Sequence, residues 1–314
     1  MKTRMTRIVR IPRYGRLITL ALLQTVFLGQ AAGAQPDRYA PTILQLAPTP
    51  RAATLANTTA ARDIEAIFGN PAMVGVATGT IAALGRFDAA TQLTIASSTS
   101  LGPFNVGIGG QYLDHVSQFI GARYWSYALQ VGGFQPAVSA VGALALSTTF
   151  RGNRIGAAVK YVDQRTGSLH DGAPSLDLGL ARDVSRYTVG VTVQNIGDGI
   201  HFQYGSAGSA SLPLRVSAGV TSYGWTVGPL DVNGSAGASV LPDGDVLPAL
   251  GLEFGYAPLE GYNFAFRAGM RRPELRAQQP LSIGASAGLD RFALEYAWED
   301  WVNGSTHRLA LRVR

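Results

Sequence analysis

Charged residues recur at alternate positions late in the chain, with apolar residues between them. Glu295 and Glu299 alternate with aromatic residues, and Arg308 and Arg312 alternate with leucines. Alternate residues of a β-strand share one face, so these carboxylates and guanidinium groups can form ion pairs between neighbouring strands. The charges that we expect on this inward face are Lys160, Asp177, Arg215, Glu253, Arg267, Glu295, Glu299, Arg308 and Arg312.

Two interpretations of these inward charges stay open. We favour ion pairs that tie neighbouring strands together; a charged pore lining is the alternative, but alternating signs would cancel most of its selectivity. A two-residue hairpin turn at 303–304 and a loop at 259–261 fix the expected register. The expected opposite pairs are Glu299 with Arg308, Glu295 with Arg312, and Glu253 with Arg267.

Other reactive residue types lack the spacing that catalysis or metal binding requires. Residues 284–288 match a nucleophile-elbow pattern, but they lie inside an alternating strand instead of a strand-to-helix turn. The four histidines are scattered, the chain has no cysteine, and the sequence places no histidine beside a serine. We therefore predict no enzymatic activity, no metal site and no cofactor.

The elements that must position the inward charges are β-strands. In residues 154–163, 174–182 and 186–195, apolar residues alternate with glycine, small and hydroxyl residues. This second face is too poor in charge for a solvated surface and suits a crowded lumen. The predicted fold is all-β: an antiparallel transmembrane β-barrel of about 14 strands, with a short N-terminal hatch or plug segment. The strand candidates are 74–84, 90–99, 103–113, 117–124, 125–133, 139–150, 154–163, 174–182, 186–195, 212–222, 228–240, 246–257, 261–270, 280–289, 291–300 and 305–313.

The first 34 residues have a basic start, an apolar run and an Ala-Gly-Ala ending, as a signal peptide has. We predict three parts: 1–34 as a signal peptide cleaved near Ala34, 35–72 as an N-terminal periplasmic or hatch segment, and 73–314 as an outer-membrane barrel. Six of the 26 basic residues lie in this leader, which leaves 20 basic and 20 acidic residues. The basic balance therefore does not indicate nucleic-acid binding. Export to the outer membrane of a Gram-negative-type bacterium is expected.

Ordered short motifs resemble the PorV/PorQ family, which belongs to the wider group of FadL-like outer-membrane barrels. They are 51–57, 63–66, 70–72, 160–162, 177–179, 194–197, 212–215 and 307–311. The resemblance implies a non-enzymatic barrel that serves protein secretion by binding type IX-like cargo or partners. Passive transport of small hydrophobic molecules, or a structural plugged barrel, are the alternatives.

The resemblance also implies a gate in the N-terminal segment. Its candidate residues are Arg51, Asp63, Glu65, Asn70, Pro71 and Ala72. Alternatively, Asn70 and Pro71 only end a short helix and start the first strand. The implied partners are outer-membrane lipid and either secreted cargo and secretion-system proteins or hydrophobic small molecules, without nucleic acid.

Two further expectations concern the openings of the barrel. The long gaps 164–173, 196–211 and 271–279 are expected at the end where both termini lie, the reverse of the usual arrangement. Pro103 or Pro136 could interrupt strand pairing and mark an opening in the wall.

Overall fold

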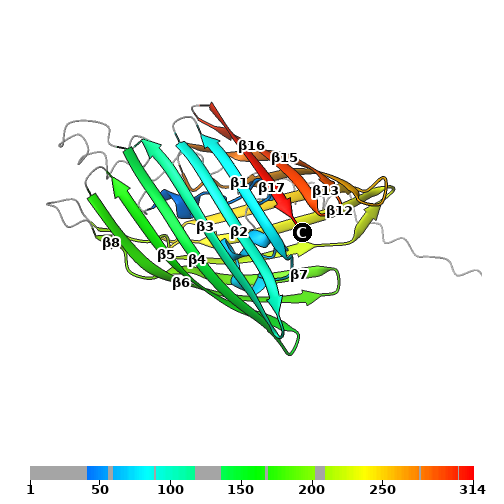
Figure 1. Ribbon diagram of the computed structural model, residues 1–314, viewed down its shortest axis with the longest axis horizontal. Coiled ribbons are helices and arrows are strands. Elements are labelled where there is room, and N and C mark those ends of the chain that lie inside the picture. Colours follow the sequence, from blue (N-terminus) through cyan, green and yellow to red (C-terminus); the bar gives the residue numbers. More distant parts are fainter. Residues whose placement is uncertain are drawn as a thin grey trace, which may run out of the picture. The chain divides into compact units, whose positions relative to one another are not determined.

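A single antiparallel sheet closes on itself in this protein (Figure 1). The computed structural model describes residues 41–55, 59–87, 90–116, 136–166, 169–201, 209–275, 277–302 and 304–314. Strand β1 pairs with β17, and β10 pairs with β12, so the sheet has no free edge along its main strands. Short β11 continues β10 along β12, which makes a closed barrel of 14 strands. This architecture confirms the predicted fold class.

Except for β10 and β11, which continue one another, each wall strand is long enough to cross a bilayer at a tilt. In chain order, the strands of the wall are β1 (Gly79–Phe87), β2 (Ala90–Leu101), β3 (Phe104–Val116), β4 (Pro136–Phe150), β5 (Asn153–Thr166), β6 (Leu169–Val184), β7 (Tyr187–Ile196), β10 (Arg215–Ser222), β11 (Trp225–Val227), β12 (Leu230–Val240), β13 (Val246–Tyr256), β14 (Tyr262–Arg271), β15 (Gln278–Leu289), β16 (Phe292–Trp301) and β17 (Gly304–Val313). A separate two-stranded ladder joins β8 (Ile200–His201) to β9 (Ser209–Ala210). The candidates 117–124 and 125–133 lie outside the described residues.

The alternation of residue types follows the two faces of the wall. On β17, Leu309 and Leu311 point outward and are about half exposed, while Arg308 and Arg312 point inward and are 1% exposed. An apolar outer face and a polar, small-residue inner face are the pattern of a barrel in lipid. None of the helices in the described residues is long and apolar enough to span a membrane.

The two ends of the barrel differ in their connections. Strand β1 begins and β17 ends at one end, which also carries the short connections 102–103, 151–152, 185–186, 228–229 and 290–291. We call it the turn end and the opposite one the loop end. The connections 197–214 and 272–277 lie at the loop end, because antiparallel strands return every second connection to the same end. The expected placement of the long gaps beside the termini was therefore wrong, and most of 164–173 is strand.

The hatch, residues 41–55 and 59–74, lies inside the barrel (Figure 1). It contains η1 (Thr42–Gln45), α2 (Pro50–Thr54), η2 (Ile64–Phe68) and η3 (Pro71–Met73). Inward glycines let the hatch backbone touch the wall directly. A Cβ at Gly156 would lie 2.5 Å from the carbonyl carbon of Pro71, and one at Gly251 would lie 2.8 Å from the Cα of Leu55. The glycine-rich inner face therefore accommodates the hatch.

Candidate functional site

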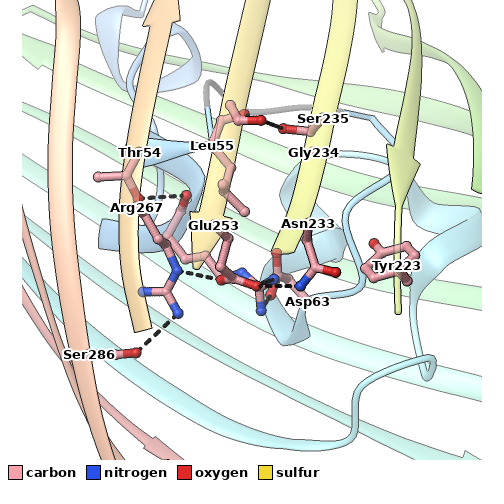
Figure 2. A network of polar contacts seen from close by, with 12 residues as sticks. Thr54, Leu55, Asp63, Tyr223, Asn233, Gly234, Ser235, Glu253, Arg267 and Ser286 are labelled. Atoms are coloured by element: carbon pink, nitrogen blue, oxygen red, sulfur yellow. Dashed lines mark hydrogen bonds and ion pairs between the residues drawn. The ribbon is translucent and has the colours of Figure 1, made fainter. Parts of the chain in front are cut away.

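A cluster of buried charges joins the hatch to the wall. The guanidinium of Arg51 lies 3.0 Å from Asp63 within the hatch and 3.2 Å from Glu253 on β13. Glu253 accepts a 2.6 Å hydrogen bond from Arg267 on the neighbouring strand, and it lies directly opposite that residue in the register. Figure 2 shows Arg267 and Asn233 converging on Glu253 beside the hatch residues Thr54 and Leu55.

Arg312 forms the second half of this charge cluster. It lies 2.8 Å from Glu295 on β16, 3.4 Å from Glu65 and 3.8 Å from Asp63 of the hatch. Thr49 donates a 2.5 Å hydrogen bond to Glu65. Burial raises the pKa of Glu65 above its ordinary value and the nearby Asp63 carboxylate adds to the rise, while Arg312 opposes it. We call Arg51, Asp63, Glu65, Glu253, Arg267, Glu295 and Arg312 the central charge cluster.

The register between β16 and β17 differs from the prediction. Trp301 lies opposite Gly304, so Glu299 faces Thr306 and Glu295 faces Ala310. The expected register was wrong by two residues, because the two-residue connection is 302–303 instead of 303–304. The arginines reach the carboxylates diagonally: Arg308 lies 2.7 Å from Glu299. A shift of two residues keeps every side chain on its face, which is why the same charges still meet.

The motifs at 160–162, 177–179, 194–197 and 212–215 converge on one buried polar cluster. Lys160 lies 2.8 Å from Asp177 and donates a 2.5 Å hydrogen bond to Asn195. The backbone of Asn195 donates to Asp177, and its side chain donates to the carbonyl of Pro213. Asn195 has a φ of 60°, a left-handed conformation that asparagine tolerates well. Arg215, which begins β10, pairs instead with Glu274.

The Asn70-Pro71-Ala72 segment is fixed to the wall near the turn end. Asn70 accepts a hydrogen bond from the backbone of Ala72 and so caps η3. Its side-chain amide donates to the carbonyl of Thr59 at 2.9 Å and reaches the carbonyl of Leu180 on β6 at 3.4 Å. The candidate gate residues are therefore all inside the barrel, and both a capping role and an anchoring role fit Asn70.

An apolar layer at the loop end is the feature that the sequence analysis missed. Phe87, Leu113 and Trp301 point inward there and break the small-or-polar pattern of the inner face. Ile43 and Leu46 of the hatch fill the centre of this layer and are 0% and 3% exposed. The layer consists of Ile43, Leu46, Phe87, Ala90, Leu113, Val141, Val162, Ala173, Ile200, Leu212, Leu275 and Trp301.

Arg308 forms the floor of the apolar layer. Its guanidinium lies 4.8 Å from the centre of the Phe87 ring and donates to the carbonyl of Ala47 at 2.9 Å. Glu299 neutralises this charge and also pairs with Arg271. Two polar cavities beside η1 have volumes of about 50 and 20 Å³, which is room for water rather than for an organic ligand.

A serine–histidine contact on the outer face also escaped the sequence analysis. The Ser305 hydroxyl lies 3.1 Å from Nε2 of His307, whose Nδ1 lies 2.8 Å from the Tyr296 hydroxyl. The alternation could have found the Ser305–His307 contact, since residues two apart share a face. The expected register hid only the Tyr296 contact, because it placed Tyr296 opposite Leu311 instead of Leu309. The third group is a phenol rather than the carboxylate or amide that orients a catalytic histidine. We assign no reaction to this contact.

The wall is interrupted between β10 and β11, not at the expected prolines. Pro103 lies in a turn and Pro136 pairs with Val116 at the start of β4, so neither proline opens the wall. At the interruption, the Tyr223 hydroxyl donates to the carbonyl of Ala60 in the hatch at 3.2 Å. Gly224 follows with a φ of 73°, which lets the chain resume pairing one residue out of step.

The fold is a closed antiparallel β-barrel of 14 strands that holds a hatch in its lumen. No protein-family model matches the sequence, and no curated protein matches it. Three solved structures are similar over most of both chains. The CymD monoaromatic hydrocarbon channel has a TM-score of 0.54 and 11% identity, over 87% of this chain and 97% of that one. The Pseudomonas putida toluene transporter TodX has a TM-score of 0.55 and 8% identity, over 88% and 97%.

A Pseudomonas aeruginosa FadL homologue is the third, with a TM-score of 0.52 and 10% identity, over 88% of this chain and 99% of that one. At these identities the likeness shows the fold. The neighbours are channels and transporters, which is consistent with the prediction of a non-enzymatic protein.

Proposed function

We propose that this protein is an outer-membrane channel for small hydrophobic molecules and that its hatch is the gate. The observation that carries the proposal is the apolar layer at the loop end, which Ile43 and Leu46 of the hatch fill. A layer of this kind is a poor lining for a water-filled pore and a good one for an apolar solute. The FadL-like fold, shared with channels for hydrocarbons, supports the same function.

The segment that fills the apolar layer is a short helix without a side-chain cap. Helix η1 has one turn, and Pro41 before it makes no side-chain capping hydrogen bond. An apolar ligand that displaced Ile43 and Leu46 would keep the layer dry, so the exchange would cost little hydrophobic free energy. Below the layer, the ligand would meet the Arg308–Glu299 pair. Onward passage therefore requires movement of the hatch or exit through the wall.

Tryptophan fluorescence tests this proposal, because Trp301 lies in the apolar layer with its ring 5.2 Å from that of Phe87. Titration of the purified full chain with toluene should quench or shift the emission. Trp301→Phe should abolish the saturable part of this response. Trp225→Phe is the matched control, because Trp225 is 44% exposed near the turn end. A response that survives Trp301→Phe would contradict the proposal.

A second candidate function is protein secretion of the PorV/PorQ type. The observation that supports it is the convergence of four family-like motifs on one cluster around Lys160, Asp177 and Asn195. The test is co-purification of the full chain with a type IX cargo signal domain. Capture of that domain without any toluene response would favour secretion over transport.

A further inference from the structure

An apolar groove crosses the outer wall on the side of β10 to β15. Its volume is about 590 Å³, within the range of roughly 300–1,000 Å³ that is typical of ligand pockets. Its lining combines small residues with larger apolar residues. The principal lining residues are Val220, Gly234, Ala236, Leu250, Ala268 and Met270.

The groove faces lipid, not the lumen. Ser235, between Gly234 and Ala236, points inward and lies 3.5 Å from the carbonyl of Leu55 in the hatch. Its two neighbours on β12 therefore point outward. Figure 2 shows the hatch side of this same wall, with Ser235 facing Leu55. The hatch backbone closes the inner side, so the groove is a depression in the outer surface and not a pore.

One end of the groove reaches the turn end of the barrel. Tyr187 and Ser222 line it there and lie opposite each other in the register of β7 and β10. Arg186 directly precedes Tyr187 in the 185–186 turn. A groove that begins at one membrane interface and runs between apolar side chains matches the path of a lipid acyl chain.

Arg186 adds a charge at that end. Its guanidinium lies 5.3 Å from the centre of the exposed Trp225 ring and donates to the carbonyl of Gly224 at 3.2 Å. Arg182 also projects outward at this end, from β6. In the part of the chain that the structure describes, neither arginine forms an ion pair with a carboxylate. Arginine binds phosphate well, and an aromatic ring under it keeps the guanidinium in place.

We propose that the groove and Arg186 together bind one anionic phospholipid of the periplasmic leaflet. The acyl chain would lie over Gly234 and Ala236, and the phosphate would contact Arg186, with Arg182 nearby. The turn end is the periplasmic end by the usual placement of short turns. This lipid site is independent of the transport proposal, since it lies on the opposite side of the wall from the lumen.

Native mass spectrometry of the delipidated full chain tests the site. The protein is titrated with equal amounts of phosphatidylglycerol and phosphatidylcholine, and bound lipid is counted. Phosphatidylglycerol should bind at lower lipid concentrations than phosphatidylcholine. Arg186→Ala should weaken that binding about five-fold, the factor for one arginine at an anionic lipid surface. Ala236→Leu, which fills the groove from the lipid side, should prevent retention of both lipids.

Matched controls separate the site from general lipid adhesion. Arg291→Ala removes an exposed arginine from the corresponding place in the 290–291 turn, and Ala82→Leu enlarges an outward alanine on β1; neither should change lipid binding. Equal retention of the two lipids by the wild-type chain would overturn the proposal. The same applies to equal effects of Arg186→Ala and Arg291→Ala, or to unchanged lipid binding by Ala236→Leu.

Discussion

The two layers of the lumen are closed in different ways. At the loop end, the apolar layer is filled by Ile43 and Leu46 from a one-turn helix without a side-chain cap. Towards the turn end, the central charge cluster fixes the hatch to two wall strands through Glu253 and Arg312, and Glu295 on a third strand pairs with Arg312. One layer depends on non-directional contacts, which another apolar group can replace. The other depends on paired buried charges, which nothing in the membrane can replace.

This difference indicates which part of the hatch can move. When Ile43 leaves the apolar layer, its hydrophobic contacts are lost, and an apolar ligand can restore them. Losing Arg312 from its cluster leaves carboxylates buried without a partner. We therefore expect ligand binding to open the η1 segment locally, and the 59–74 segment to move only when the whole hatch is released for transport.

The largest effect is expected from Arg312→Met. It leaves Glu65 and Glu295 buried without their cation and should lower the free energy of unfolding by about 3–5 kcal/mol. Arg272→Met is the control, because Arg272 forms a partly exposed pair with Asp245 at 3.3 Å and should cost at most about 1 kcal/mol. Urea unfolding of both variants in detergent measures the difference. If both substitutions lowered the free energy of unfolding equally, the contrast between the two layers would have no basis.

A smaller effect is expected from Asn70→Ala. This change removes the cap on η3 and the hydrogen bond to Thr59, and it should cost about 1–3 kcal/mol. Asn70→Ser keeps an acceptor for the cap but cannot reach the carbonyl of Thr59. Limited proteolysis of the hatch should rank wild type, Asn70→Ser and Asn70→Ala in order of increasing cleavage. If Asn70→Ser resists cleavage as well as wild type, Asn70 acts only as a cap.

Glu65 gives the central charge cluster a pH dependence. Its pKa is raised from an ordinary value near 4.5 by burial and by Asp63. The folded chain therefore keeps the proton after the unfolded chain has lost it, and stability falls as pH rises from about 4.5 through the raised pKa. Wild type should lose stability relative to Glu65→Gln over that range, measured by urea unfolding at stepwise pH. A stability difference that grows in the opposite direction would contradict the direction of the shift.

The smallest effect on barrel stability is expected from Ile43→Asn. An asparagine side chain at position 43 is unfavourable inside the apolar layer. We therefore expect η1 to leave the layer while the barrel strands remain paired. The free energy of barrel unfolding should change by no more than about 0.5 kcal/mol, because η1 opens separately from the barrel. Hydrogen exchange at residues 41–47 should rise at the same time. Exchange that rises equally in 59–74 would show that the two layers open together.

The barrel was predictable because its signal is local. In β5 and β17, the alternation of residue types shows which side chains point inward. The two-residue period of the side chains then determines which charged side chains can meet. The register of β16 and β17 was not predictable, because it depends on β16 ending at Trp301. The apolar layer was missed because Phe87, Leu113 and Trp301 lie near strand ends where the pattern is reversed. There the inward residue is apolar, and its outward neighbour, Arg86, Asp114 or Asp300, is charged. Likewise, the Tyr223–Gly224 interruption depends on a contact with Ala60, which no local pattern records.

Tethering the hatch to the wall tests the central claim, that the hatch is a gate, most directly. A Cβ at Gly219 would lie 2.6 Å from Oγ1 of Thr59, and the chain has no cysteine, so Thr59→Cys with Gly219→Cys offers a single reversible disulfide. Uptake of labelled toluene is measured in cells of a Gram-negative host that express this double variant, before and after reduction. We predict little uptake while the tether is oxidised and recovery to the wild-type rate on reduction. Equal uptake in both states would contradict the release of the whole hatch, because it would show that hydrophobic molecules pass while the 59–74 segment is held to the wall.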